Sequence, residues 1–172
     1  MILTAAYLIG LVGACAEWRA YLQTDDAELR RWSACGALLW TAMYLLLGAY
    51  TAAVMMFLTA ARTLVSGYHA ARKWWVFSLF VALFLLLLIF SWQGTKSLLP
   101  AFAAVNTTIA LFYFSGIKLR LLLVLSSIAW ISNDLIWHAW PALFAEVIAL
   151  LLNLSTLFIL RFNDTSEMTA KH

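Results

Sequence analysis

Apolar residues run along this chain in seven stretches of nearly equal length, separated by short polar or glycine-containing breaks. Each stretch is about 17–20 residues long, at the short end of what an α-helix needs to cross the hydrocarbon core of a bilayer. The stretches cover residues 3–22, 30–48, 51–67, 74–92, 98–115, 119–137 and 142–161. The pattern therefore predicts an all-α integral membrane protein with seven transmembrane helices.

The composition agrees with a chain that lies in a bilayer. Of its 172 residues, 65% are hydrophobic and only 11% are charged, and a soluble domain of this size does not hide so much apolar surface. The many Trp, Tyr and Phe residues suit a protein bounded by two aromatic belts. Basic runs and polar segments are too short for nucleic-acid binding, so we expect the lipid bilayer as a partner and no nucleic acid.

The two cysteines and the short motifs give no sign of a metal or cofactor. Cys15 and Cys35 both lie in apolar runs, and we interpret them as small buried hydrophobic residues rather than as a disulfide or a metal site. The sequence contains no HExxH or GxSxG motif and no cluster of His, Cys and Asp at metal-ligand spacing. We therefore expect no metal, no cofactor and no enzyme activity.

The basic residues indicate how the helices are oriented. With seven spans, all but one of the basic residues outside the helix interiors fall on one side: Arg19, Arg30, Arg31, Arg72, Lys73, Lys118, Arg120, Arg161 and Lys171. The other side receives Lys96 alone, and Arg62 lies within a span. Because basic residues concentrate on the cytoplasmic side, we expect the N-terminus outside and the C-terminus inside.

An internal repeat relates the two halves of the chain. When the chain is shifted by 90 residues, the apolar segments superimpose without a gap, with Arg30 on Arg120 and Trp40 on Trp130. The repeat predicts two parallel three-helix repeats joined by a linker helix, a 3+1+3 arrangement. The units are a first repeat at 1–68, a linker at 69–97, a second repeat at 98–162 and a disordered cytoplasmic tail at 163–172.

Polar side chains interrupt the apolar helices at positions that share a face. The sixth span carries Trp130, Asn133 and Asp134 on one helical stripe, followed by His138. Acids and amides inside a membrane helix are costly unless they face a cavity or a partner. We therefore expect the polar stripes of several helices to face each other between the two repeats, where secondary transporters bind their substrates.

We divide the candidate site residues into two groups by their chemistry and their expected depth. Aromatic rings can stack on a sugar or a planar ring, and amides and arginine can fix a solute by hydrogen bonds. The candidates for substrate binding are Trp40, Trp130, Asn133, Asn153, Asn106 and Arg62. Carboxyl and imidazole groups can act as gates or carry protons. The candidates for gating or coupling are Glu17, Asp134, His138 and Glu146.

Some of these side chains also have a purely structural interpretation. Trp40 and Trp130 are equally expected as packing residues, because aromatic stripes on helices usually belong to a core. Asn153 can be an interhelical hydrogen-bonding residue worth about 1 kcal/mol rather than a ligand to a solute. The sequence leaves both interpretations open.

The charged candidates have alternatives that depend on depth. Arg62 and Glu17 lie late in inward-running helices, where they can pair with each other or extend to the cytoplasmic surface. Asp134 and His138 lie near a helix end, where the membrane–water interface is the commoner place for an ionisable side chain. These alternatives also stay open from the sequence alone.

Parts of the chain resemble the bacterial inner-membrane YgjV family. The resemblance rests on Ala61-Arg62-Thr63-Leu64, on Leu98-Leu99-Pro100, and on the run from Glu146 through Asn153 to Arg161-Phe162. That family looks like a relative of the SWEET, PQ-loop and PnuC transporters, whose fold is the 3+1+3 arrangement. The resemblance implies a multi-pass location in the bacterial inner membrane, with Arg62, Asn153 and Trp130 lining the path. SWEET and PQ-loop proteins carry a proline in the first helix of each half, whereas Gly10 is the counterpart of Pro100 here.

Two classes of function follow from these observations. The leading hypothesis is a transporter or facilitator for a sugar or similar small polar metabolite, bound between the two repeats. The alternative is a membrane receptor, scaffold or assembly factor on the same fold, in which the polar residues of the two repeats would satisfy one another across a dry interface. Homo-oligomers are possible in either case, because an apolar oligomer interface is indistinguishable in sequence from a lipid-facing surface.

Overall fold

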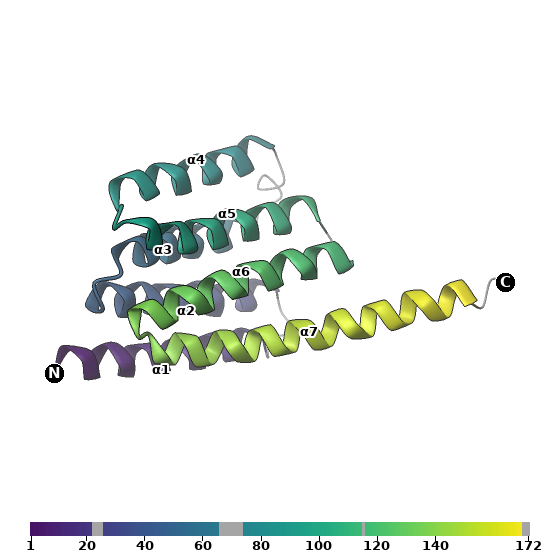
Figure 1. The fold of residues 1–172 in the computed structure, drawn as a ribbon, viewed down its shortest axis with the longest axis horizontal. Helices are drawn as coiled ribbons and strands as arrows, with labels where there is room; N and C mark the ends of the chain where they lie inside the picture. Colours follow the sequence, from purple (N-terminus) through teal and green to yellow (C-terminus); the bar gives the residue numbers. More distant parts are fainter. Residues whose placement is uncertain (22–25, 66–73, 115, 170–172) are drawn as a thin grey trace.

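The computed structural model describes residues 1–21, 26–65, 74–114 and 116–169, and nearly all of these residues lie in α-helices (Figure 1). A 3₁₀ turn, η2 (Thr95–Ser97), precedes the fifth helix. The helices are α1 (Ile2–Tyr21), α2 (Asp26–Leu46), α3 (Tyr50–Val65), α4 (Trp74–Phe90), α5 (Leu98–Tyr113), α6 (Gly116–Trp137) and α7 (Trp140–Thr169).

Each helix falls on one of the seven apolar stretches, so the predicted all-helical architecture is confirmed. Two helical segments, Ile2–Ala20 and Ile117–Trp137, are long and apolar enough to cross a membrane. Three shorter apolar segments, Tyr50–Val65, Trp74–Phe90 and Trp140–Ser155, accompany them. Because one stretch gives one helix, the breaks in hydropathy were sufficient to locate the helix ends to within a few residues, apart from the end of α7.

The last helix is longer than the hydropathy pattern indicates. We expected helix to end near residue 161 and a disordered tail to follow, but α7 continues to Thr169 and extends beyond the other helices (Figure 1). The sequence contains no glycine or proline after Pro141, so nothing in the backbone stops the helix where the apolar residues end. Residues 170–172 lie outside the described part of the chain.

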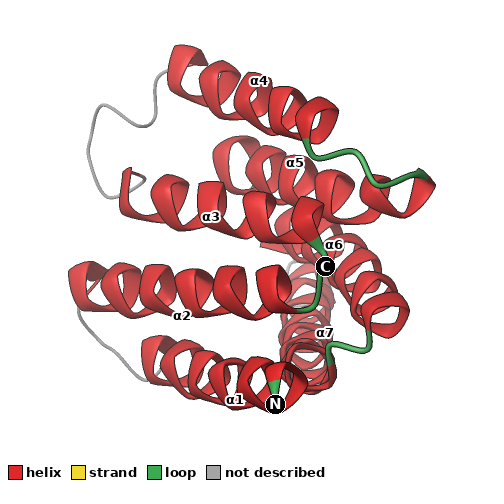
Figure 2. Ribbon diagram, turned by 90° about the vertical axis from the view of Figure 1, so that its left-hand side faces the viewer, coloured by secondary structure: helices red, strands yellow, loops and turns green. Residues whose placement is uncertain are grey.

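The helices pack as two consecutive sets. In the first set α1 lies against α2 and α2 against α3, and in the second α5 lies against α6 and α6 against α7. The two sets meet where α1 contacts α7 and where α3 contacts α5. Figure 2 shows the first set as one row and α5 to α7 beside it, with α4 at the edge against α3 and α5.

Small residues allow the close contacts between these helices. A Cβ atom at Gly10 would lie 2.5 Å from Sδ of Met43 and 3.0 Å from Cβ of Pro141. Gly10 therefore sits where α1, α2 and the start of α7 converge. Small residues at helix interfaces let backbones approach closely, which is how membrane helices gain packing energy.

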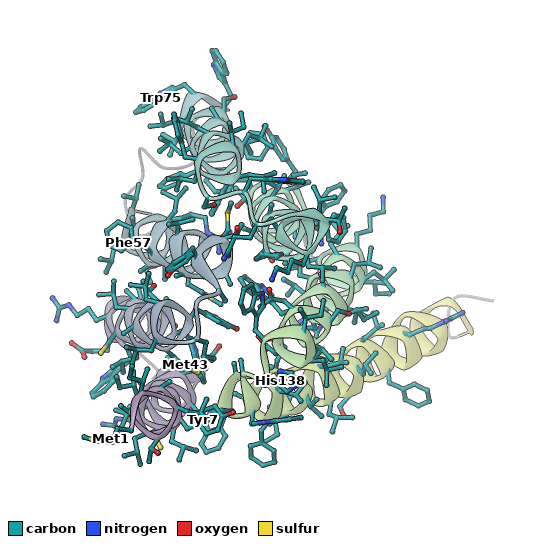
Figure 3. All side chains as sticks on the ribbon, turned by 60° about the vertical axis from the view of Figure 1, so that its left-hand side comes forward. Met1, Tyr7, Met43, Phe57, Trp75 and His138 are labelled. Carbon is teal, nitrogen blue, oxygen red and sulfur yellow. The ribbon has the colours of Figure 1, made fainter. Side chains whose placement is uncertain are left out.

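Large apolar side chains cover much of the outside, as a lipid-facing surface requires. Phe57 and Trp75 point away from the bundle (Figure 3) and are 57% and 49% exposed. Cys15 and Cys35 are also exposed and not disulfide-bonded, so the expectation that both are buried is wrong. A thiol is apolar enough to lie on a surface that faces lipid tails.

A polar network joins the turn after α2 to the turn after α4. Nε2 of Gln93 donates to the carbonyl of Gly48 at 2.8 Å, and Oε1 of Gln93 accepts from the backbone N–H of Thr51 at 3.3 Å. The hydroxyl of Thr51 lies 3.0 Å from that of Ser97. Gly48 has a φ of 76°, a conformation that glycine adopts without a steric penalty. The network therefore ties α4 to the first set at one end of the bundle.

The crowding at Gly10 gives a prediction about stability. Gly10→Val should destabilise the protein by about 1–3 kcal/mol, because added carbons have no room between Met43 and Pro141. Thermal unfolding of the detergent-purified protein, followed by tryptophan fluorescence, measures the change. Ala5→Val adds the same branched side chain to an exposed position of α1 and is the matched control. Equal melting temperatures for both variants would show that the three segments do not pack this tightly.

Candidate functional site

A buried contact joins the last turns of α2 and α6, between the two helix sets. The hydroxyl of Tyr44 donates to Oδ1 of Asp134 at 2.5 Å, and each residue is only 1% exposed. The same oxygen accepts a hydrogen bond from Nδ2 of Asn133 at 3.2 Å. The ring of Tyr44 also stacks on Trp130, with centroids 6.1 Å apart. Asp134 is thus enclosed between α2 and α6, and it lies in the last turn of α6, near the helix end that the interfacial interpretation names.

A cavity of about 370 Å³ adjoins this contact. Its walls come from all helices except α4, and they mix aromatic, polar and charged side chains. The lining residues are Glu17, Ser33, Ala37, Trp40, Tyr44, Met56, Thr59, Arg62, Thr63, Thr107, Trp130, Asp134, Ala142, Ala145 and Glu146. A polar cavity of this kind is what the convergence of helical stripes would produce.

A second cavity of about 430 Å³ lies beside the first. It shares Glu17, Met56, Thr107, Trp130 and Glu146 with the first cavity, so the two adjoin. Its remaining lining residues belong to α6 and α7: Arg120, Leu123, Ser126, Ser127, Ala149, Leu152 and Asn153. Together the two cavities make one chamber between the helix sets, which we call the central chamber.

The ionisable groups on the wall of the first cavity are mostly carboxyl groups. Glu17, Asp134 and Glu146 supply three carboxyl groups from α1, α6 and α7, whereas Arg62 of α3 is the one basic residue among those lining it. Oε2 of Glu17 accepts a hydrogen bond from Nε1 of Trp40 at 3.2 Å. That bond holds a carboxyl group and an aromatic ring together on the wall.

Arg62 lies within the bundle. Its side chain is 5% exposed, and Nη1 donates to the hydroxyl of Thr108 on α5 at 2.7 Å. That hydroxyl in turn donates to the carbonyl of Ala104 at 2.7 Å. The structure therefore places the guanidinium on the chamber wall, and the alternative in which it extends to the surface does not fit this burial.

Most of the candidate residues from the sequence meet in the central chamber. Trp40, Trp130, Arg62, Glu17, Asp134 and Glu146 line the first cavity, and Asn153 lines the second. These residues are up to 136 positions apart in sequence, counted from Glu17 to Asn153. The folded chain brings them together because the helix sets face each other.

The amide of Asn153 is held by a basic neighbour. Its Oδ1 accepts from Nη1 of Arg120 at 3.2 Å, and its Nδ2 donates to the backbone carbonyl of Arg120 at 3.0 Å. Both bonds join α7 to α6 at the edge of the second cavity. Asn153 therefore serves helix packing and lines the chamber at the same time.

Three other candidates lie off the walls of the central chamber. Asn106 donates to the carbonyl of Leu122 at 2.6 Å and to the hydroxyl of Ser126 at 2.8 Å, which ties α5 to α6. Asn133 is buried behind Asp134, and its Oδ1 has no hydrogen-bond partner within the described residues. His138 is exposed in the turn before α7, where its carbonyl accepts from the hydroxyl of Tyr7 at 2.9 Å (Figure 3).

The geometry also identifies residues that the sequence analysis did not select. Tyr44 is the clearest, because it is fully buried, lines the chamber and bonds Asp134. Its position four residues after Trp40 puts both rings on one helical face, and that spacing was the available signal. Thr107 and Met56, which line both cavities, have no comparable signal in the sequence.

Comparison with known proteins identifies a family for this chain. The model of the family Imp-YgjV, described as "Bacterial inner membrane protein", matches residues 4–164. No curated protein and no solved structure matches the chain. The match covers all of the helices that line the central chamber.

The Tyr44–Asp134 contact gives a prediction about stability. Tyr44→Phe should destabilise the protein by about 1–3 kcal/mol, because it leaves a buried carboxyl group without its hydroxyl partner. Tyr50→Phe removes the same hydroxyl from a residue that is 54% exposed and is the control. Thermal unfolding in detergent measures both variants.

A double-mutant cycle separates the contact from the general effect of each substitution. Because both partners belong to one hydrogen bond, Tyr44→Phe and Asp134→Asn combined should cost less than the sum of the two single changes. Additive losses in melting temperature would mean that the two side chains do not interact in the membrane-extracted protein.

Proposed function

The chain belongs to the Imp-YgjV family of bacterial inner membrane proteins, and we propose that it is a transporter or facilitator for a small polar solute. The proposed binding site is the central chamber between the two helix sets. The observation that carries the proposal is the chamber itself, because a cavity with charged and aromatic walls inside an apolar bundle is costly unless it holds something polar.

We propose that the two helix sets are parallel repeats with α4 as their linker. A shift of 90 residues converts the contact of α1 with α7 into that of α5 with α3, and both contacts are present. The hydrogen bond between Tyr44 and Asp134 joins residues that are 90 positions apart. A contact between equivalent residues is expected at the axis that relates two repeats, which supports this arrangement.

The lining of the chamber agrees with the same relation. Equivalent residues Thr59 and Ala149 line the first and second cavities respectively, as do Thr63 and Asn153. Glu17 and its equivalent Thr107 line both. The two cavities are thus the counterparts expected of a two-fold relation. An odd linker helix gives both repeats the same orientation, as in the SWEET transporters, and the relation to SWEET and PQ-loop proteins is part of this proposal.

The size and chemistry of the chamber suit a small metabolite. Each cavity is close to the lower end of the volume typical of ligand pockets, about 300–1,000 Å³. Trp40 and Trp130 offer ring surfaces to a sugar or another small polar metabolite, and Arg62 and Asn153 offer hydrogen bonds. In a scaffold that binds no solute, larger apolar side chains in this space would stabilise the fold. The presence of the chamber therefore favours transport over the receptor or scaffold alternative.

The proposed orientation gives a prediction about topology. With the N-terminus outside and the C-terminus inside, green fluorescent protein fused after His172 should fluoresce, and alkaline phosphatase at the same place should be inactive. Phosphatase fused after Gly94, in the turn between α4 and α5, should be active, because that turn would face the periplasm. The reverse pattern of activities would contradict the orientation.

The proposed function predicts solute uptake that depends on the chamber wall. In proteoliposomes loaded with purified protein, uptake of a solute selected by thermal-shift screening should fall at least tenfold with Trp130→Ala and with Asn153→Ala. Trp140→Ala is the matched control, because Trp140 is 49% exposed and lies away from the chamber. Ligands that bind the folded protein raise its melting temperature by mass action, which makes the screen possible.

Two outcomes would count against the proposal. Uptake that is unchanged in both Trp130→Ala and Asn153→Ala would show that the central chamber is not the binding site. If no solute in a panel of sugars, nucleosides, vitamins, amino acids and organic acids shifts the melting temperature or enters the liposomes, the receptor or scaffold alternative would be preferred.

A further inference from the structure

The buried arginine of the chamber wall, Arg62, is held by a neutral side chain. Arg62 makes no ion pair with any residue that the structure describes, and Thr108, to which it donates, is neutral. A guanidinium carries five N–H donors in a planar fork, so a single hydroxyl leaves most of them for another acceptor. A buried charge that is not compensated is strongly destabilising. The position of Arg62 on the chamber wall therefore points to an acceptor group that arrives with the solute.

The acceptor that fits an arginine best is a planar carboxylate. Arginine binds carboxylates through two parallel hydrogen bonds, which add geometric selectivity to the attraction of opposite charges. The hydroxyl groups of a neutral sugar can accept from the guanidinium but do not neutralise it. A solute with a carboxylate would satisfy both requirements at once.

The carboxyl groups in the same cavity suit a hydrogen-bond donor that carries a positive charge. Asp134 and Glu146 line it, and both hydrogen bonds that the described residues donate to Asp134 end on Oδ1. Its second oxygen is thus available to a donor in the chamber. Glu17 is a third carboxyl group on this wall. A solute that carried only carboxylates would offer the oxygens of these groups no donor.

The aromatic residues fit a positive charge as well. Trp130 and Tyr44 stack beside Asp134, and Trp40 donates a hydrogen bond to Glu17. Asp134 and Glu17 therefore each have an aromatic ring next to the carboxyl group. An ammonium group gains from contact with the face of an aromatic ring as well as from a carboxylate. The wall thus has one region suited to a carboxylate and another suited to an ammonium group.

We infer that the solute is a small zwitterion of the amino-acid type, with its carboxylate on Arg62 and its ammonium group between Asp134 and Glu146. This inference rests on the proposed function and narrows its substrate class. A purely cationic amine would leave Arg62 without a counter-ion, and a purely anionic acid would face the carboxyl groups. A neutral sugar would leave both kinds of charge unmatched.

The test uses matched ligands that differ in one charged group. The purified full-length protein is titrated with the twenty common L-amino acids by thermal shift and isothermal calorimetry. Each amino acid that binds is compared with the amine that lacks its carboxylate and with the acid that lacks its amino group. We expect the amino acid to bind at least tenfold more tightly than either analogue.

Two variants assign the two charged groups to their partners. Arg62→Gln should weaken binding of the amino acid at least tenfold while changing the affinity for the amine less than threefold. Glu146→Gln should weaken binding of the amino acid at least tenfold while changing the affinity for the acid that lacks the amino group less than threefold. Glutamine keeps a hydrogen-bond donor at position 62 and removes the buried charge. The melting temperature of the unliganded Arg62→Gln variant verifies that it folds.

The outcomes distinguish this inference from the proposed function. If sugars bind or are transported and amino acids do not, the zwitterion is excluded while the transporter stands. If amino acids bind but each variant reduces the affinity for the amine, the acid and the amino acid equally, then Arg62 and Glu146 are not the partners of the carboxylate and the ammonium group. If no solute of any class binds or enters proteoliposomes, the proposed function fails and this inference fails with it.

Discussion

The structure depends on how it satisfies polar groups inside an apolar bundle. The hydrogen bond from Tyr44 to Asp134 joins α2 to α6, the middle helices of the two sets, and each of these helices contacts both other members of its set. Buried polar groups in hydrocarbon have no water to bind, so they must meet one another or line a cavity. This contact therefore links the two sets, and Glu17, Arg62 and Glu146 line the chamber beside it.

The number and the limits of the helices could be predicted from hydropathy because one apolar stretch makes one span. The end of α7 could not, because a helix continues into polar sequence when no glycine or proline stops it. The sequence also identified the polar stripes but not their partners. Arg62 and Asn106 both interrupt apolar helices, yet Arg62 lines the chamber whereas Asn106 ties α5 to α6, since the rotation of each helix is decided by packing.

The two halves match in position more than in chemistry. The residues equivalent to Arg62 and Thr63 of α3 are Leu152 and Asn153 of α7, and the residue equivalent to Met56 is Glu146. In the proposed repeat arrangement, equivalent positions thus supply different groups to the two sides of one chamber. A chamber with a basic residue on α3 and acidic residues on α6 and α7 can orient a solute that a symmetric chamber would bind in either direction.

The central claim is that the chamber is open to water and not a dry packed interface. The most direct measurement is the reaction of single cysteines with a charged, water-soluble thiol reagent, in protein whose Cys15 and Cys35 are changed to serine, in membrane vesicles open to both sides. Thr59→Cys lines the chamber and should react rapidly, whereas Phe57→Cys, on the outer surface of α3, should face lipid and stay unreactive. A Thr59→Cys variant as unreactive as Phe57→Cys would contradict the account.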